Sequence, residues 1–88
     1  MIQQIVTITN SLGLHARPAV MLVKTASRFK SDIKLSKDDL EIDGKSILGV
    51  LMLAAEKGSQ IVLKVNGKDE KEALKELAEL FKTGFGEE

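Results

Sequence analysis

The chain has 88 residues, of which 43% are hydrophobic and 30% are charged. A chain of this length holds one hydrophobic core, so we expect residues 1–88 to form a single domain that folds unaided. Thirteen basic residues balance thirteen acidic ones, which excludes a global field that would draw the protein onto nucleic acid or an anionic membrane.

The sequence contains no cysteine, which limits its chemistry further. A disulfide framework, an iron–sulfur cluster and thiolate ligation of zinc are excluded, and the composition is compatible with a reducing compartment. The first ten residues, MIQQIVTITN, have neither the basic start nor the apolar centre of a secretion signal. Since no stretch approaches the roughly 20 apolar residues of a membrane span, we expect a cytoplasmic protein without membrane insertion.

The hydrophobic period changes along the first third of the chain. Ile2, Val6 and Ile8 lie on one side of an alternating segment, which predicts a half-buried strand over residues 2–8. From residue 16 onwards the apolar side chains recur at steps of three or four, which predicts an amphipathic helix. The expected buried stripe of this helix consists of Ala16, Ala19, Val20, Val23, Ala26 and Phe29.

The middle of the chain predicts a β-hairpin and a short helix. Residues 33–35 and 40–42 alternate in polarity around a KDD turn, a pattern typical of two paired strands. The segment GKSILGVLMLAAEKG, residues 44–58, then predicts a helix with Ser46 as its N-cap. Gly58 suits the left-handed residue that ends such a helix.

The last third of the chain predicts one more strand and one more helix. Residues 61–65 alternate in polarity, and Asn66-Gly67 ends the strand. Asp69 and Glu72 resemble a capping box at the start of the helix. Its expected buried stripe consists of Ala73, Leu74, Leu77, Leu80 and Phe81. We expect the final residues, GFGEE, to fray.

The element order is therefore β-α-β-β-α-β-α. Four half-apolar strands and three one-sided helices predict two layers. The expected fold class is α+β, an open-faced β-sandwich in which a four-stranded antiparallel sheet carries three helices on one face and exposes the other face to water.

The segment LGLHARP, residues 12–18, holds the only histidine and the only proline of the chain. Pro18 fits the first turn of a helix, where its missing N–H removes no helical hydrogen bond, so His15 lies at the N-terminal edge of the first helix. The first amides of a helix have no intrahelical partner and lie at the positive end of its dipole. Ala16, Arg17 and Pro18 therefore form a helix start that suits a phosphate.

The chemistry of LGLHARP favours phosphoryl transfer. Arg17 provides a planar cation for phosphate oxygens, and this cation and the helix start both disfavour protonated imidazole, so we expect a neutral His15. A neutral imidazole can attack phosphorus, and the anionic product would be held by the same groups. A lone histidine at a helix start is often only an exposed turn residue, so the histidine by itself does not distinguish a functional role from a structural one.

Known enzyme signatures fit the sequence poorly. It offers no second histidine and no cysteine for a metal, no P-loop or GxGxxG for a nucleotide, and no recognisable general base beside the histidine. The residues therefore predict a carrier that accepts a phosphoryl group, with no metal and no cofactor, and not an enzyme.

LGLHARP, together with GKSILGV at residues 44–50, resembles the histidine-containing phosphocarrier protein, HPr, of the bacterial phosphoenolpyruvate-dependent phosphotransferase system. The resemblance spans nearly the whole chain and implies a four-stranded antiparallel sheet covered by three helices. It implies that His15 accepts a phosphoryl group on its δ (pros) nitrogen from phosphorylated enzyme I. The group then passes to the A domain of an enzyme II for sugar uptake, and Arg17 assists both transfers.

The resemblance gives a meaning to the surfaces of two helices. On the first helix a mainly basic stripe runs from the histidine at steps of four, three and four, through Arg17, Met21, Lys24 and Arg28. An ordinary solvated face looks the same. A second helix that packs Ile47, Val50 and Ala54 on the sheet leaves apolar neighbours such as Met52 uncovered. The expected docking residues are Met21, Lys24, Arg28, Ile47, Leu48 and Leu51. Such a surface suits weak binding to partners with an acidic rim.

Ser46 has a second role in proteins that this chain resembles. There the serine can be phosphorylated by a dedicated ATP-dependent kinase, HPr kinase/phosphorylase. A phosphoserine carries about −1.5 to −2 charges at neutral pH, which would repel an acidic partner from the apolar surface. Some family members also bind a transcriptional regulator in this phosphorylated state, so a purely regulatory carrier is an alternative.

Two other functions compete with sugar transport. LMLAAEKGSQI and LFKTGFGEE are similar to the nitrogen-related phosphocarrier, whose role is regulatory, whereas KSILGV is closer to the sugar-type carriers. A small sandwich of this order could also bind RNA through exposed strand aromatics. The three phenylalanines, Phe29, Phe81 and Phe85, lie outside the expected strands, so we predict no nucleic-acid partner. We expect a monomer, because one small site must serve several partners.

Overall fold

The computed structural model describes residues 1–87. The elements follow in the order β1 (Ile2–Thr7), α1 (Ala16–Ser27), β2 (Asp32–Lys37), β3 (Leu40–Asp43), α2 (Ile47–Met52), β4 (Gln60–Asn66) and α3 (Glu70–Lys82). A short 3₁₀-helix, η1 (Gly84–Gly86), follows α3. The predicted order β-α-β-β-α-β-α is confirmed, and η1 is an addition to it.

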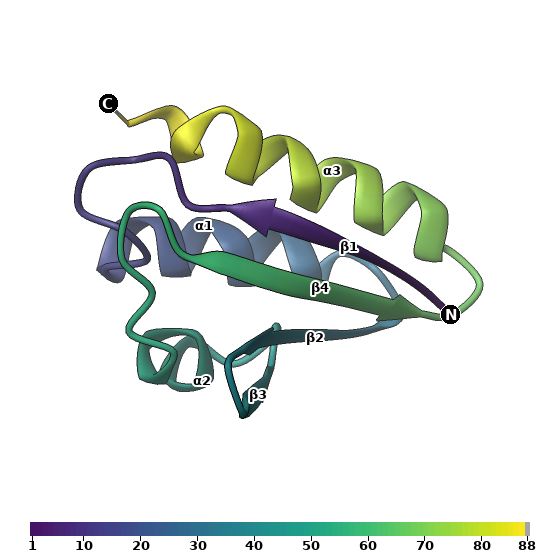
Figure 1. The fold of residues 1–88 in the computed structure, drawn as a ribbon. Helices are drawn as coiled ribbons and strands as arrows, with labels where there is room; N and C mark the ends of the chain where they lie inside the picture. Colours follow the sequence, from purple (N-terminus) through teal and green to yellow (C-terminus); the bar gives the residue numbers. More distant parts are fainter. Residues whose placement is uncertain (88) are drawn as a thin grey trace.

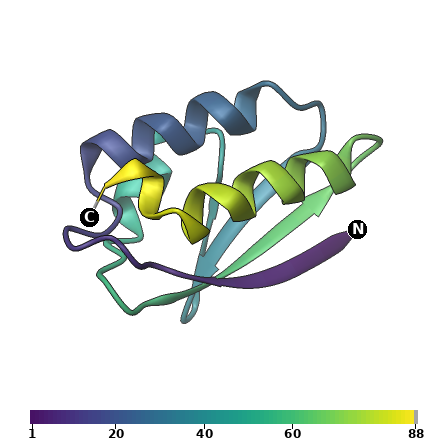
Figure 2. The same ribbon diagram turned by 90° about the horizontal axis from the view of Figure 1, so that it is seen from above.

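The four strands form one antiparallel sheet in the order β1-β4-β2-β3. The central strand β4 pairs Ile61 with Val6 of β1 and Leu63 with Leu35 of β2. Helices α1 and α3 lie over the same face of this sheet, as the two perpendicular views show (Figures 1 and 2). The predicted open-faced α+β sandwich is therefore confirmed.

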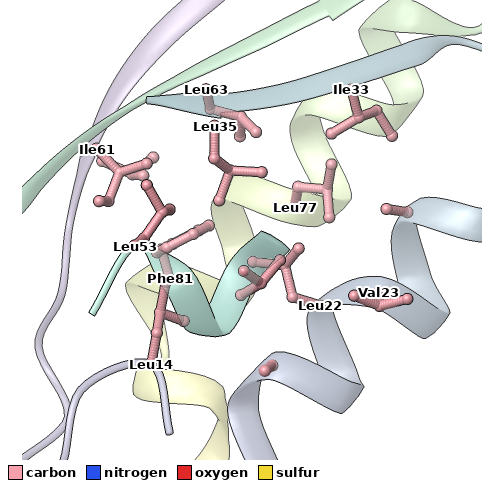
Figure 3. Close-up of a cluster of buried hydrophobic side chains, with 14 of the residues drawn as sticks. Leu14, Leu22, Val23, Ile33, Leu35, Leu53, Ile61, Leu63, Leu77 and Phe81 are labelled. Carbon is pink, nitrogen blue, oxygen red and sulfur yellow. The ribbon is translucent and has the colours of Figure 1, made fainter. Parts of the chain in front are cut away.

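The core lies between the sheet and the helices because the strands alternate in polarity. Ile33, Leu35, Ile61 and Leu63 are buried on the helix side, where they meet side chains such as Leu77 (Figure 3). Each fully buried side chain of this kind stabilises the fold by roughly 1.5–3 kcal/mol. None of the helices in residues 1–87 combines the length and the apolar character that a membrane crossing requires.

The buried stripe of α1 differs in part from the predicted one. Leu22 is fully buried and was absent from the predicted stripe, whereas Ala16 is exposed. Ala16 is the first residue of the helix and lies beyond the part of α1 that packs on the core. Leu22 lies three residues after Ala19 and four before Ala26, and therefore shares their face.

Helix α2 begins as predicted and ends earlier than predicted. The hydroxyl of Ser46 accepts a hydrogen bond from the amide of Gly49 at 3.0 Å, which confirms Ser46 as the N-cap. The helix ends at Met52, and the left-handed residue that follows it is Ala54, not Gly58 as the sequence predicts. This turn buries Leu53 and places the carbonyl of Ala55 against the loop before α1. These contacts join segments that are distant in the sequence, so the periodicity of the helix does not reveal them.

Asp69 is the N-cap residue of α3, but the predicted capping box is wrong. Within residues 1–87 its side chain makes no capping hydrogen bond. Its carboxylate instead accepts hydrogen bonds from the amides of Lys30 and Ser31, at 2.9 Å and 3.0 Å, and from the Ser31 hydroxyl. These bonds lower the pKa of Asp69, with the Ser31 hydroxyl as the largest cause. The carboxylate thus connects the start of α3 to the turn between α1 and β2.

The expectation that GFGEE frays is also wrong for the residues that the structure describes. Phe85 is 2% exposed and packs edge-on against Phe81, with 5.0 Å between the ring centres. The burial of this aromatic side chain holds η1 against the end of α3. Glu88, the last residue of that segment, lies outside the described residues.

Candidate functional site

His15 is the N-cap residue of α1. Its backbone is extended, and its carbonyl accepts the first helical hydrogen bond from the amide of Ala19 at 3.0 Å. Among residues 1–87 its imidazole makes no capping hydrogen bond to the helix, and the side chain is 35% exposed. The ring is therefore accessible to solvent beside the positive end of the α1 dipole.

The loop before His15 depends on a glycine at position 13. Gly13 has a φ of +68°, and a Cβ at this position would overlap the carbonyl oxygen of Ala55. The next residue, Leu14, is buried in the core, and its amide donates a hydrogen bond to Ala55 at 2.9 Å (Figure 3). Because Leu14 points inward, the chain turns at the buried Gly13 and presents His15 at the surface.

The first turn of α1 is formed as predicted. Ala16, Arg17 and Pro18 are its first three residues, and Pro18 is buried whereas Arg17 is exposed. A proline here costs no helical hydrogen bond, because the first amides of a helix have no acceptor within it. The helix start therefore lies beside the imidazole and the guanidinium, an arrangement that attracts phosphate.

His15 has an acidic partner that the sequence does not predict. The Glu87 carboxylate Oε1 lies 2.9 Å from His15 Nε2 and accepts a hydrogen bond from the Asn10 amide, Nδ2, at 3.1 Å. The hydrogen bond with His15 is the largest cause of a lowered pKa of Glu87, to which Asn10 and Arg17 add. The structure thus places a carboxylate beside the histidine, where the sequence shows no such partner.

One signal in the sequence could have revealed Glu87. Phe85 stands between two glycines near the end of the chain, and an isolated large apolar residue there indicates a segment that returns to the core. Both glycines have positive φ values, 62° at Gly84 and 74° at Gly86. The backbone thus turns on both sides of the buried ring, and Glu87 reaches the start of α1.

The apolar part of the predicted docking surface is exposed. Leu48 is 69% exposed, and Ile47 and Leu51 are also exposed, as is Met52. Of the three residues expected to pack inward, Val50 is buried as predicted, whereas Ile47 and Ala54 are exposed. The short α2 turns a narrower face to the core than a helix extending to residue 57 would. We call Ile47, Leu48 and Leu51 the α2 patch.

The predicted basic stripe of α1 is only partly free. Lys24 is exposed, but Met21 packs against the core, and Arg28 donates a hydrogen bond to Glu76 of α3 at 3.1 Å. The Arg28 guanidinium also lies 5.7 Å from the centre of the Phe29 ring. Leu12, which the analysis left out, is 73% exposed only three residues before His15.

The described part of the chain offers no metal site. Among residues 1–87, no three histidine, cysteine, aspartate or glutamate side chains form a group that could hold an ion.

Comparison with known proteins places this arrangement in a family. Residues 2–83 match the family model described as "PTS HPr component phosphorylation site". The chain is 47% identical over 87 residues to the phosphocarrier protein HPr of Neisseria meningitidis serogroup A, which covers 99% of this chain and 98% of the relative.

Solved structures agree with this assignment. The crystal structure of HPr-C-His from Thermoanaerobacter tengcongensis is 43% identical and superimposes with a TM-score of 0.96 over 100% of this chain and 99% of that one. A structure of an HPr dimer from the same organism is 42% identical, with a TM-score of 0.80 over 99% and 100% of the two chains. The chain therefore belongs to the HPr family of phosphocarrier proteins.

Proposed function

We propose that the protein carries a phosphoryl group on His15 within a phosphoenolpyruvate-dependent phosphotransferase system of the cytoplasm. The observation that carries the proposal is the accessible imidazole at the start of α1, with Arg17 beside it, in a chain of the HPr family. Phosphorylated enzyme I is the donor, and the A domain of an enzyme II is the acceptor. The protein is a substrate of both transfers and not itself an enzyme.

The chemistry needs little beyond positioning. His15 Nδ1 attacks phosphorus while the bond to the donor breaks, and the second transfer reverses these roles on the acceptor. The first amides of α1 and the guanidinium of Arg17 are donors for the oxygens of the transferred group. Because these groups are in place before the reaction, they stabilise the negative charge without reorganisation.

The α2 patch and Lys24 are the proposed docking surface. The α2 patch and Lys24 are all exposed, and a surface that combines apolar side chains with a cation suits weak binding to a partner with an acidic rim. Local charge raises the rate of encounter more than the affinity. Arg28 and Met21 contribute at the margin of this surface, since one is hydrogen-bonded to α3 and the other is half buried. We propose a monomer as the working form, although a similar chain has been solved as a dimer.

Ser46 is the proposed site of regulation. A phosphate on its hydroxyl would lie at the N-terminus of α2, directly before the α2 patch, where the helix dipole tolerates it. The added charge would weaken docking without unfolding the protein. The kinase is HPr kinase/phosphorylase, and a transcriptional regulator is a further partner of the phosphorylated form.

Intact mass after incubation with enzyme I, phosphoenolpyruvate and Mg²⁺ tests the proposed function. The wild type is expected to gain one acid-labile phosphoryl group, and His15→Ala is expected to gain none. Transfer from the labelled protein to purified A domains of the sugar and nitrogen-related branches then identifies the acceptor, for which we propose the sugar branch. A wild type that stays unmodified beside a proven donor would contradict the proposal.

A further inference from the structure

A carboxylate closes the site on the side of the imidazole opposite to the proposed nucleophile. Glu87 Oε1 lies 2.9 Å from His15 Nε2, although 72 residues separate the two in the sequence. Phosphoryl transfer through Nδ1 leaves Nε2 without a role of its own. The carboxylate thus contacts the ring nitrogen that does not receive the phosphoryl group.

The contact is part of a connected network. The amide of Asn10 donates to Glu87 at 3.1 Å and also to the carbonyl of Gly13 at 2.8 Å, and Asn10 is 1% exposed. One buried side chain thus fixes the carboxylate relative to the loop that ends in His15. The Glu87 carboxylate is bonded to both Asn10 and His15, and these two contacts define its position.

The segment that carries Glu87 is also fixed. Phe85 is buried against Phe81, and the amide of Glu87 donates to the carbonyl of Gly84 at 2.9 Å. A Cβ at Gly84 would lie 3.3 Å from the Thr9 hydroxyl, so the backbone runs close to the end of β1. In Figure 2 the η1 segment lies against the start of α1, in agreement with the contact between Glu87 and His15.

The protonation of the carboxylate determines which ring nitrogen is the nucleophile. The pKa of Glu87 is lowered, so the group is ionised at neutral pH and accepts hydrogen bonds only. The proton shared with His15 must then be on Nε2. In the neutral ring, the free electron pair is on Nδ1.

We propose that Glu87 is a positioning residue for phosphoryl transfer, whose carboxylate holds the proton of His15 on Nε2 and compensates the positive charge that the ring acquires. This inference rests on the proposed function of His15. The electron pair of Nδ1 forms the bond to phosphorus, and the bond from phosphorus to the donor breaks with its electrons staying on the donor. No proton leaves His15, because Nε2 keeps its own. When the phosphoryl group passes to the acceptor, the bond between Nδ1 and phosphorus breaks and Nε2 again keeps its proton.

The test compares two variants of Glu87 with a matched control. Glu87→Ala removes the acceptor, and Glu87→Gln keeps an acceptor oxygen without the charge. Glu72→Ala removes an exposed carboxylate from α3, away from the site. The measurements are the single-turnover rate of phosphorylation by phosphorylated enzyme I, the KM for that donor, and the NMR signal of the Nε2 proton in the unphosphorylated protein.

We expect Glu87→Ala to slow transfer about tenfold, the equivalent of one charge-assisted hydrogen bond, with the KM unchanged. Glu87→Gln should fall between Glu87→Ala and the wild type, and Glu72→Ala should match the wild type. The wild type should show a hydrogen-bonded, slowly exchanging Nε2 proton that Glu87→Ala loses. The midpoint of urea unfolding should be the same in Glu87→Ala and in the wild type. If Glu87 had only a structural role, the Nε2 proton signal would not change without a change in this midpoint.

Three results would overturn the inference. Transfer by Glu87→Ala at the wild-type rate would show that the carboxylate has no part in the reaction. Faster transfer would show that it repels the incoming phosphoryl group. A wild type that accepts no phosphoryl group would overturn the proposed function and this inference together, whereas the first two results leave the function of His15 intact.

Discussion

The side chain of His15 is accessible because of the residue two positions before it. Gly13 adopts a φ of +68° and runs against the carbonyl of Ala55, so the loop can turn Leu14 inward and His15 outward. The chemistry of the site thus depends on a residue that has no chemistry of its own. In the mechanism that we propose, Glu87 acts in a similar indirect way, because it contacts Nε2 whereas phosphorus is bonded to Nδ1.

Gly13→Ala is expected to destabilise the protein and to disturb the site. A left-handed backbone costs about 1–3 kcal/mol for a residue with a side chain, and the overlap with Ala55 adds to this cost. Gly58→Ala is the matched control, since its φ is +91° but its Cβ would meet no atom within 4 Å. Urea unfolding measures the free energy of unfolding of both variants. An equal decrease in the two would mean that the overlap with Ala55 does not contribute to the loss of stability.

The ends of the helices depend on contacts from other elements. Helix α2 ends at Met52 because the turn at Ala54 buries Leu53 and brings Ala55 to the loop before α1. Helix α3 begins at a residue whose carboxylate holds the amides of Lys30 and Ser31. In both cases a tertiary contact determines where the helix begins or ends, and helix propensity alone would not predict that boundary.

Asp69→Asn is expected to lower the free energy of unfolding at pH 7, with a smaller effect in acid. The pKa of Asp69 is lower in the folded protein than in the unfolded chain, so its contribution is complete above the unfolded value of about 3.9. That contribution is lost as the pH falls through the folded value. Urea unfolding at pH 7 and at several values between 5 and 2 checks this.

The control for this experiment is Asp39→Asn, in the exposed turn between β2 and β3. It removes one carboxylate without breaking the connection to Ser31, and its effect should be small at every pH. An Asp69→Asn variant whose loss of stability stays constant from pH 7 to pH 2 would show that the ionised carboxylate is not the stabilising group.

On the scale of the whole molecule, the sheet carries its helices on one face and gathers the site at one end. The loop before α1, the turn after α2 and the end of the chain meet there, through Leu14, Ala55 and Glu87. The burial of Phe85 holds the last of these segments in place. Residues 84–87 are therefore part of the fold and of the candidate site.

Phe85→Ala is expected to cost roughly 3–5 kcal/mol of stability, the usual loss for a buried phenylalanine. It should also release Glu87 and slow phosphorylation of His15 as Glu87→Ala does. Urea unfolding and the single-turnover rate measure the two effects. A stable variant with an intact Nε2 proton signal would contradict the role assigned to this aromatic side chain.

The features that the sequence predicts correctly are local. The strand order along the chain follows from alternation, the start of α1 from Pro18, and the cap of α2 from Ser46, because each depends on neighbours within a few residues. Apart from Leu22, which belongs to the local stripe of α1, the features that it misses depend on contacts between distant segments. The left-handed Ala54 and the pairing of Glu87 with His15 become visible only when the fold brings those segments together.

Transfer through Nδ1 of His15 is tested most directly by NMR spectroscopy of the protein labelled with ¹⁵N and phosphorylated by enzyme I. We expect coupling of phosphorus to Nδ1 of His15 and a proton that stays on Nε2. Phosphorus bonded to Nε2, or a phosphoryl group on any other residue, would contradict it.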